Sequence, residues 1–406
     1  MSKHPLAAVL LLTTCLVTQS PPAAAAPKPD DQRLLAETFD SFGADVADKL
    51  AKPGQNLCFS PASLCLCLSM LLPGANGETL AELQKALCPK DWDGPRATAA
   101  MPALLTHLHD PRKIELSVVH DLWPQADHPL LPDFLAAVHT AFGAEVRPLD
   151  YARHTELARK TINDHVAKAT KDRILELLDP TALETTTLLV LTNALYFKAD
   201  WLQPFPAEDT RDGPFHLPNG VEVKVPLMHL HGTLACAEVD GVQIVRLPYV
   251  DPDYAFDAAL PAAGEPLATA EIVLQPDGMA KWTEAAKLQP VLVTLPRFRI
   301  QGSFSLGKTL RALGLVRTTT RGEADFRGID GGTGQLFVDE VVQKTFLEVG
   351  EKGTEAAAAT AMVGKSGRRQ PQAKAFQADR PFAYALRDLK TGLVLFAGRV
   401  VDPRAQ

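Results

Sequence analysis

Two pairs of histidines in the sequence have a spacing that could bind a metal ion. His107 and His109 form one His-x-His pair, and His229 and His231 form the other. On a β-strand, residues two apart point to the same face, so such a pair could share one metal ion. Neither pair has an obvious third ligand. We therefore interpret these histidines as solvated side chains and expect no metal site.

The cysteines do not form a disulfide framework. An odd number remains once the N-terminal leader described below is set aside, and their spacing shows no repeat. A free cysteine behaves as a small hydrophobic residue, so we expect core packing. The five residues concerned are Cys58, Cys65, Cys67, Cys88 and Cys236.

Motifs of the common enzyme classes are absent from the sequence. There is no Gly-x-Ser-x-Gly, no His-Glu-x-x-His, no glycine-rich phosphate loop and no Cys-x-x-Cys. We therefore expect a protein that is not an enzyme and that uses no cofactor. The formal net charge of -7 offers no polycationic surface for a phosphate backbone, so we expect no nucleic-acid binding. A protein partner fits better.

The segment 354–374 is the one long irregular stretch after the leader, and it is rich in Ala, Gly, Lys, Arg and Gln. Taken alone, this composition is that of a flexible linker. A strong strand pattern precedes the segment, however, and another follows it. A long irregular segment whose two ends are anchored inside a compact domain is usually functional or disordered.

The elements that would hold this segment begin with helices. Apolar residues spaced by three or four predict an amphipathic helix from about Asp30 to Leu50. Ser60 and Pro61 read as an N-cap and a first helical residue, followed by the wholly apolar run 64–72, which predicts a buried helix. Further helices are predicted around 80–87, 162–173 and 306–313.

Strand patterns dominate the rest of the chain. Period-two or continuous apolar runs predict strands over 187–197, 221–227, 242–247, 291–300 and 336–349. The chain closes with a predicted hairpin, 381–387 and 393–401. Helices first and strands later, without regular alternation, indicate an α+β protein built on large mixed sheets.

The first residues have the composition of a targeting signal. Lys3 and His4 precede the apolar run 6–17, and small residues end the segment, so we predict a signal peptide over 1–26. The remaining residues, 27–406, are predicted to form a single domain. We expect a secreted protein, extracellular or periplasmic.

Two further features bear on the route of export. No later stretch approaches the ~20 apolar residues of a membrane span, so we expect none. Cys15 lies in a weak lipoprotein-like sequence, and a lipid anchor there is the alternative to a cleaved leader. No Asn is followed two positions later by Ser or Thr, which favours a bacterial route.

Several motifs in order make the chain, from about Asp30 to Pro403, resemble the serpin family. The segment 56–64 (NLCFSPASL) is similar to the family's early Asn-x-x-x-Ser-Pro-x-Ser motif, and 192–201 (TNALYFKADW) is similar to its central strand motif. The other matches are 295–298 (LPRF), 324–326 (ADF), 380–382 (RPF), 396–400 (FAGRV) and the Ala-rich segment 351–361.

The resemblance implies a serpin fold of three β-sheets with about nine α-helices and an exposed reactive-centre loop, here about 351–371. It also implies that this loop, once cleaved, inserts as a new strand into the central sheet. Small residues would allow insertion, and Thr354, Ala356, Ala358 and Thr360 would face the interior. Ala and Gly are poor strand formers, so we expect the segment to stay unpaired before cleavage. The predicted hinge consists of Glu351, Gly353, Thr354, Glu355, Ala356, Ala357, Ala358, Ala359 and Thr360.

The resemblance assigns roles to two further groups of residues. Ser60, Ser63 and Asn193 match a polar cluster where the central sheet opens, and Gln343 stands where the family usually has His. Glutamine still donates and accepts hydrogen bonds but does not titrate. Trp201, Arg297 and Glu351 match the top of the sheet, called the breach, where Arg297 and Glu351 are expected to form an ion pair. Ordinary core hydrogen bonding is the alternative for all of them.

The register of the reactive bond is open by at least one residue. Counting the family's common loop length from Glu351 places Gly367 before the bond, but glycine has no side chain to fill a specificity pocket. One residue further, the bond is Arg368-Arg369, which suits trypsin-like proteases with an acidic pocket. We favour Arg368, with Gly367, Lys365 and Arg369 as alternatives.

The resemblance thus implies a serine protease inhibitor that acts as a suicide substrate. Its expected partner is an extracellular, trypsin-like serine protease held in a covalent acyl complex. We expect a monomer that could polymerise by inserting its loop into a second copy. The alternative is a non-inhibitory serpin that acts as a carrier or protein-binding module.

Overall fold

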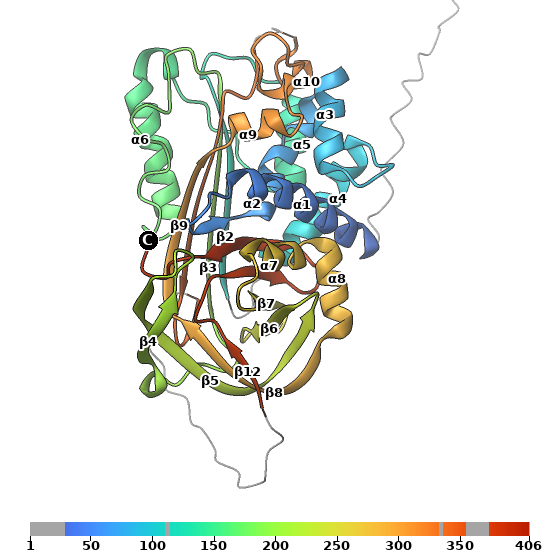
Figure 1. Ribbon diagram of the computed structural model, residues 1–406. Helices are drawn as coiled ribbons and strands as arrows, with labels where there is room; N and C mark the ends of the chain where they lie inside the picture. Colours follow the sequence, from blue (N-terminus) through green and yellow to red (C-terminus); the bar gives the residue numbers. More distant parts are fainter. Residues whose placement is uncertain (1–28, 110–113, 333–335, 355–372, 406) are drawn as a thin grey trace, which may run out of the picture.

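The structure is a computed structural model that describes residues 29–109, 114–332, 336–354 and 373–405 (Figure 1). The described residues contain ten α-helices, close to the expected nine. They are α1 (Pro29–Leu50), α2 (Pro61–Ser69), α3 (Gly77–Leu87), α4 (Gly94–His109), α5 (Pro132–Phe142), α6 (Tyr151–Ala169), α7 (Leu267–Val273), α8 (Pro276–Ala285), α9 (Gly307–Ala312) and α10 (Arg327–Asp330).

A five-stranded sheet forms the centre of the fold. Its order is β2-β3-β11-β10-β9, and β3 and β10 also pair directly with each other. That direct pairing is parallel, from Glu340 opposite Val190 to Thr345 opposite Leu195. The strands are β2 (Glu115–Pro124), β3 (Leu189–Asp200), β9 (Phe298–Ser305), β10 (Glu340–Val349) and β11 (Gly353–Thr354).

The remaining described strands are joined by hydrogen bonds into one nine-stranded sheet, in the order β1-β14-β13-β7-β6-β5-β8-β12 with β4 on β5. The expected fold has three sheets, which would leave two sheets besides the five-stranded one. The long strand β5 connects them, because its first part pairs with β4, its middle with β8 and its end with β6. The strands are β1 (Leu57–Phe59), β4 (Arg211–His216), β5 (Glu222–Val239), β6 (Val242–Pro248), β7 (Tyr254–Pro261), β8 (Lys287–Pro296), β12 (Lys374–Gln377), β13 (Phe382–Asp388) and β14 (Val394–Val400).

The predicted single strand over 291–300 is wrong. β8 ends at Pro296 in the nine-stranded sheet, and β9 begins at Phe298 in the five-stranded sheet. Proline has no backbone N–H and cannot donate to a sheet ladder, so it marks the point where the chain changes sheets. Arg297, between the two strands, therefore lies at the junction of the sheets.

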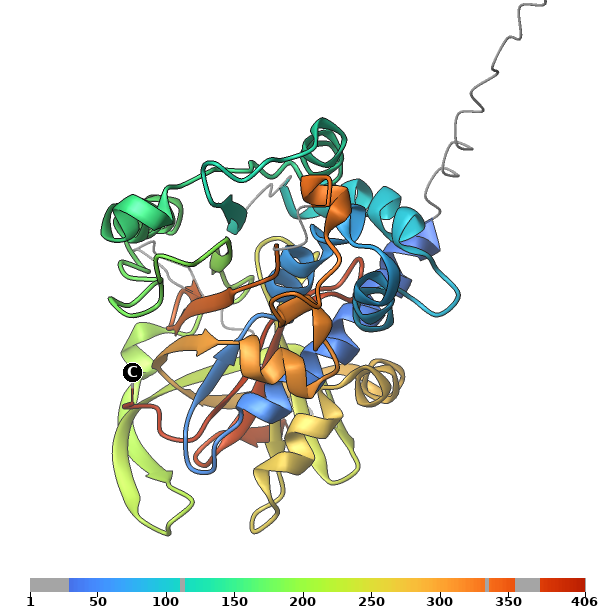
Figure 2. The same cartoon turned by 90° about the horizontal axis from the view of Figure 1, so that it is seen from above.

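Helices cover both faces of the five-stranded sheet. The predicted buried helix is α2, all of whose residues are buried, and it packs against β2 and β3. Helix α6 and the loop after it, residues 170–188, lie on the opposite face, where Ile174, Leu178, Val342 and Phe346 belong to one apolar cluster. Figures 1 and 2 show α6 separated by this sheet from α1 and α2.

Candidate functional site

The predicted hinge begins inside the central sheet. After β10 ends at Val349, the chain turns, and Gly353 and Thr354 form β11 between β10 and β3. Thr354 pairs with Val349 on one side and with Ala199 on the other, and it is fully buried. A Cβ atom on Gly353 would lie 2.0 Å from the carbonyl oxygen of Ala199, so only glycine fits there.

This arrangement differs from the expectation that the hinge stays unpaired before cleavage. The expectation rested on the low strand propensity of the segment as a whole. Strand propensity does not include the tertiary contacts of a residue, and Thr354 has two such contributions. Its side chain is fully buried, and its Oγ1 lies within hydrogen-bond distance, 2.6 Å, of the hydroxyl oxygen of Tyr249. Glu355 to Thr360, and the candidate reactive-bond residues Gly367, Arg368 and Arg369, lie outside the described residues.

Two aromatic side chains, Trp201 and Tyr249, lie beside the hinge where it enters the five-stranded sheet. The Trp201 ring stacks on the Tyr249 ring with centroids 4.5 Å apart. The Trp201 indole Nε1 donates to the Gly350 carbonyl at 2.9 Å, and its backbone N–H donates to the Lys352 carbonyl at 2.7 Å. The turn between β10 and β11 is therefore fixed by Trp201, which the motif comparison assigned to this place.

Glu351 and Arg297 form the ion pair that the resemblance implies. One Glu351 carboxylate oxygen accepts hydrogen bonds from Arg297 and, at 2.9 Å, from the Thr210 hydroxyl. Burial acts to raise the pKa of Glu351, but the hydrogen bonds from Arg297 and Thr210 outweigh it and hold the pKa below the usual value. The fold therefore favours the charged carboxylate at the top of the sheet.

We expect Glu351→Gln to lower stability by about 0.5–1 kcal/mol at neutral pH, because Arg297 is half exposed and the pair is partly screened. A lowered carboxyl pKa contributes stability above the ordinary value of 4.5, and the contribution is lost as the pH falls through the folded value. Urea unfolding midpoints of the two proteins should thus differ at pH 7 and approach each other as the pH falls below 4.5 and through the folded pKa. A difference that persists at low pH would contradict this assignment.

The predicted sheet-opening cluster is assembled around Gln343. Gln343 of β10 is directly opposite Asn193 of β3, and both are fully buried. The Gln343 side chain donates to Asn193 Oδ1 and to the Ser60 carbonyl at 2.9 Å each, and it accepts from the Ser60 N–H at 2.9 Å. The Ser63 hydroxyl donates to the same Asn193 oxygen at 2.6 Å. One amide side chain thus ties β10 to β3 and to the start of α2.

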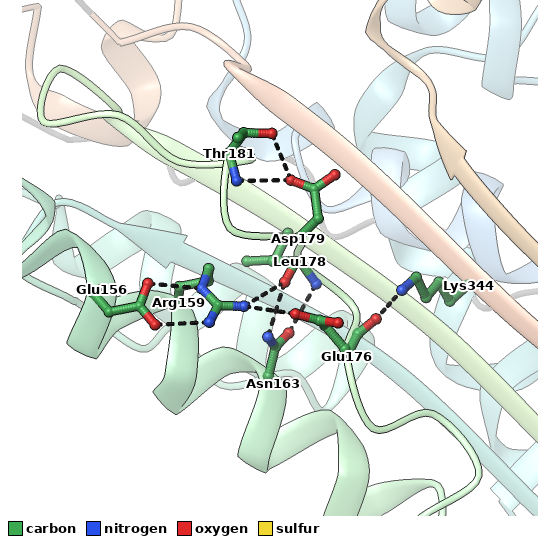
Figure 3. A network of polar contacts seen from close by, with 8 residues as sticks. All are labelled: Glu156, Arg159, Asn163, Glu176, Leu178, Asp179, Thr181 and Lys344. Carbon is green, nitrogen blue, oxygen red and sulfur yellow. Dashed lines mark hydrogen bonds and ion pairs between the residues drawn. The ribbon is translucent and has the colours of Figure 1, made fainter.

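A second polar network ties the loop 170–188 to α6 and to β10 (Figure 3). Arg159 of α6 makes two bonds to Glu156, at 2.9 and 2.7 Å, and a third to the Glu176 carboxylate at 3.0 Å. The Asn163 side-chain amide donates to the Leu178 carbonyl at 2.9 Å and accepts from the Leu178 N–H at 2.8 Å. Lys344 of β10 donates to the Glu176 carbonyl. The loop is thereby bonded to β10, one of the two strands that must separate if a new strand enters.

A family model described as serpin, serine protease inhibitor, matches residues 37–403. This chain belongs to the serpin family. It is 33% identical over 381 residues to an uncharacterized serpin-like protein of Thermococcus kodakarensis, covering 93% of this chain and 88% of that one. It is 35% identical to human Serpin B8 over 357 residues, covering 86% and 93% of the two chains. The leukocyte elastase inhibitor of Xenopus laevis is 33% identical, with 86% and 93% covered.

Solved serpin structures resemble this serpin over nearly its whole length. A highly specific serpin of the insect Tenebrio molitor matches with a TM-score of 0.82 and 28% identity, covering 93% of this chain and all of that one. Thyroxine-binding globulin in complex with thyroxine matches with a TM-score of 0.81 and 26% identity, covering 92% and 99%. The serpin fold predicted from the motifs is confirmed.

Some residues of this site were not predicted from the sequence of the serpin. Tyr249 and Thr210 contact the hinge but carry no local signal, because each acts through a partner more than a hundred residues away.

Among the described residues, no helix is long and apolar enough to cross a membrane. In the same part of the chain, no three His, Cys, Asp or Glu side chains gather in a way that could hold a metal ion.

Proposed function

We propose that this serpin inhibits an extracellular, trypsin-like serine protease as a suicide substrate. The observation that carries the proposal is the position of β11, because Gly353 and Thr354 already lie between β3 and β10. Beyond them, β3 and β10 pair directly with each other. A continuing strand could therefore replace that pairing residue by residue, starting from a hinge that is already in place.

The free energy available to such a strand is large. About ten residues paired on both sides would add roughly ten hydrogen bonds at about 0.5–1.5 kcal/mol each. This sum is comparable with the ~5–15 kcal/mol that stabilises a typical domain. The uncleaved form is then held by a kinetic barrier, and the bonds of Gln343 and of the loop 170–188 are the candidates for that barrier.

The chemistry proposed for the trap starts at Arg368. The protease serine oxygen attacks the Arg368 carbonyl carbon, an ester forms, and the Arg369 amine leaves after accepting a proton. Insertion of the freed segment from the hinge onward then carries the acyl-enzyme along the sheet before water cleaves the ester. We propose one mature domain, 27–406, that is exported as a monomer after removal of the leader.

The alternative, a carrier of a small ligand, has one observation in its favour. A cavity of about 190 Å³ lies between α1, α7 and the pair β13–β14, lined mainly by small and apolar residues. One structural relative is named as a thyroxine complex. Ligand pockets commonly measure about 300–1,000 Å³, so this cavity is small for that role. We therefore favour inhibition.

We expect trypsin and this serpin to form a complex that survives denaturation, and Arg368→Ala to slow its formation at least about a hundredfold, because the Arg side chain fills the acidic pocket. Progress curves of trypsin inhibition give the rate, and mass spectrometry of the released C-terminal fragment gives the bond. Arg369→Ala is the matched control and should retain most of the rate. Loop cleavage without any stable complex would contradict the proposal.

A further inference from the structure

Strand β8 exposes two large aliphatic side chains to solvent on its outer side. Leu288 and Leu292 are 75% and 49% exposed. They are four residues apart on the strand, so they point to the same side. Val291 and Val293, which flank Leu292, point to the other side and are buried in the core. The proposed inhibition uses neither leucine.

The strands on either side of β8 add uncharged side chains next to these leucines. In the antiparallel register with β5, Leu292 is opposite His231 and Pro290 is opposite Thr233. In the parallel register with β12, Leu292 is opposite Ala375. Figure 1 shows β5, β8 and β12 close together at the lower end of the molecule. We call this surface the β8 face, and it consists of Leu288, Pro290, Leu292, His231, Thr233 and Ala375, none of which is Asp, Glu, Lys or Arg.

The free edge of β8 is unsuited to pairing with another strand. The pairing of β12 with β8 starts at Val291, so within the described residues the stretch 287–290 is paired on the β5 side alone. Pro290 lies in this stretch and has no backbone N–H. Proline on an edge strand works against pairing with a strand of another molecule. A partner would therefore contact the side chains of the β8 face and not its backbone edge.

The place of the proposed reactive bond in the sequence decides which partner reaches this face. Arg368 lies fourteen residues after Thr354, where β11 ends, but only six residues before Lys374, where β12 begins. An extended chain spans at most ~3.3–3.6 Å per residue, so the bond lies within roughly 22 Å of Lys374. Lys374 is opposite Val291, the neighbour of Leu292. A protease of about 220 residues has a radius of gyration of about 17 Å, so it is wider than this distance.

We propose that the β8 face is a second contact surface for the trypsin-like protease that the loop attracts, an inference that rests on the proposed function. The matching surface of the protease is uncharged, because a charge set against Leu288 and Leu292 would lose water without gaining a partner. Burial of these two side chains prolongs the first, non-covalent complex. More encounters then proceed to attack at Arg368, while insertion after cleavage is unaffected.

Trypsin is the probe, and progress curves give the second-order rate constant of its inhibition. We expect Leu288→Gln to lower this constant roughly tenfold and Leu292→Gln to act in the same direction, because a polar group replaces the apolar contact. Glutamine adds no charge, so long-range attraction is unchanged. The stoichiometry of inhibition should stay the same. Leu157→Gln, at a position 62% exposed on α6, is the matched control and should keep the full rate constant.

Two further measurements show whether the effect comes from apolar contact. Leu288 is mostly exposed, so the unfolding midpoint of Leu288→Gln should equal that of the unmodified protein. The ratio of their rate constants should persist when sodium chloride is raised from about 0.05 to about 0.5 M, because salt screens charges. Equal rate constants at low salt, or a ratio that vanishes at high salt, would overturn the proposed surface.

Trypsin whose catalytic serine is replaced by alanine separates this inference from the proposed inhibition. It binds the loop without forming an ester, so its Kd reads docking alone. A weaker Kd for Leu288→Gln than for the unmodified protein supports the β8 face, even where active trypsin cleaves the loop without a stable complex and the proposed inhibition fails. An equal Kd contradicts it. A second copy of this chain is the other occupant, and a dimer in sedimentation that Leu288→Gln abolishes would overturn the assignment to a protease.

Discussion

Thr354→Arg is expected to turn this serpin from an inhibitor into a substrate, with the fraction of protease trapped per cleavage falling at least about tenfold. Thr354 is fully buried between β3 and β10, and its Oγ1 lies 2.6 Å from the Tyr249 hydroxyl. An arginine cannot occupy this position without burying an unpaired guanidinium. The variant should therefore withdraw the hinge into solvent and, after cleavage, stall at the first step of insertion while the protease hydrolyses its ester.

The measurement is the stoichiometry of inhibition with trypsin, read together with the ratio of covalent complex to cleaved serpin on denaturing gels. Thr354→Ser is the matched control, because it keeps the hydroxyl that meets Tyr249 and adds no bulk. It should trap trypsin as well as the unmodified protein. Should Thr354→Arg trap protease with unchanged stoichiometry, insertion would not pass through this position, and the role assigned to β11 would be wrong.

The start of α2 shows where the sequence suffices to predict structure. Ser60 and Pro61 predicted a capped helix, and the Ser60 hydroxyl does accept a hydrogen bond from the Ser63 N–H at 3.2 Å. Cap, proline and the apolar run that follows all favour the same element, and every signal is local. The same holds for the closing hairpin, which forms as β13 and β14.

Helix α4 shows the opposite case, since it was not predicted. It contains Pro102, which lacks an N–H and would locally break a helical hydrogen-bond pattern. The helix is held instead by tertiary packing, with Ala97, Met101, Leu104 and Leu108 fully buried on one side. Burial of this kind depends on neighbours distant in sequence, and a single sequence does not reveal them.

Asp257, on strand β7, is another residue whose environment depends on a distant partner. In the sequence it looks like an interruption of the apolar strand β7, yet it is fully buried there. Arg246, opposite it on β6, donates two hydrogen bonds of 2.7 Å to its carboxylate. A buried charge is tolerated when a bidentate partner faces it. Only the register of β6 against β7 supplies that partner.

Part of the candidate site could be predicted from the sequence, and part could not. Motif comparison located Ser60, Ser63, Asn193 and Gln343, and the structure brings all four together. It did not locate Tyr249, which contacts Thr354, or the bond from Lys344 to the loop after α6. Those contacts depend on the meeting of segments that carry no motif. The residues that would identify the target protease, around Arg368, have no structural description.

Gln343→Ala is expected to lower the stability of the uncleaved form by about 3–5 kcal/mol, because two backbone groups of Ser60 lose their partner at about 1–3 kcal/mol each and a cavity is left behind. The bond from Gln343 to Asn193 joins β10 to β3, so it must break when these two strands separate. If the substitution lowers the free-energy barrier to sheet opening by about 1.4 kcal/mol, loop-sheet polymerisation at elevated temperature should become about tenfold faster. Urea unfolding reports the first effect and native gels over time report the second.

Gln243→Ala is the matched control for this pair of effects, since it removes the same side chain from an exposed position on β6 and should change neither measurement. The two readouts of Gln343→Ala test different parts of the reasoning. A large loss of stability with unchanged polymerisation would mean that breaking the Gln343–Asn193 bond does not limit the rate of sheet opening, so Gln343 would stabilise the core without contributing to the barrier. Unchanged stability would contradict the bonds themselves. Only both effects together would support the role of Gln343, an uncharged amide that does not titrate, in slowing the separation of β3 and β10.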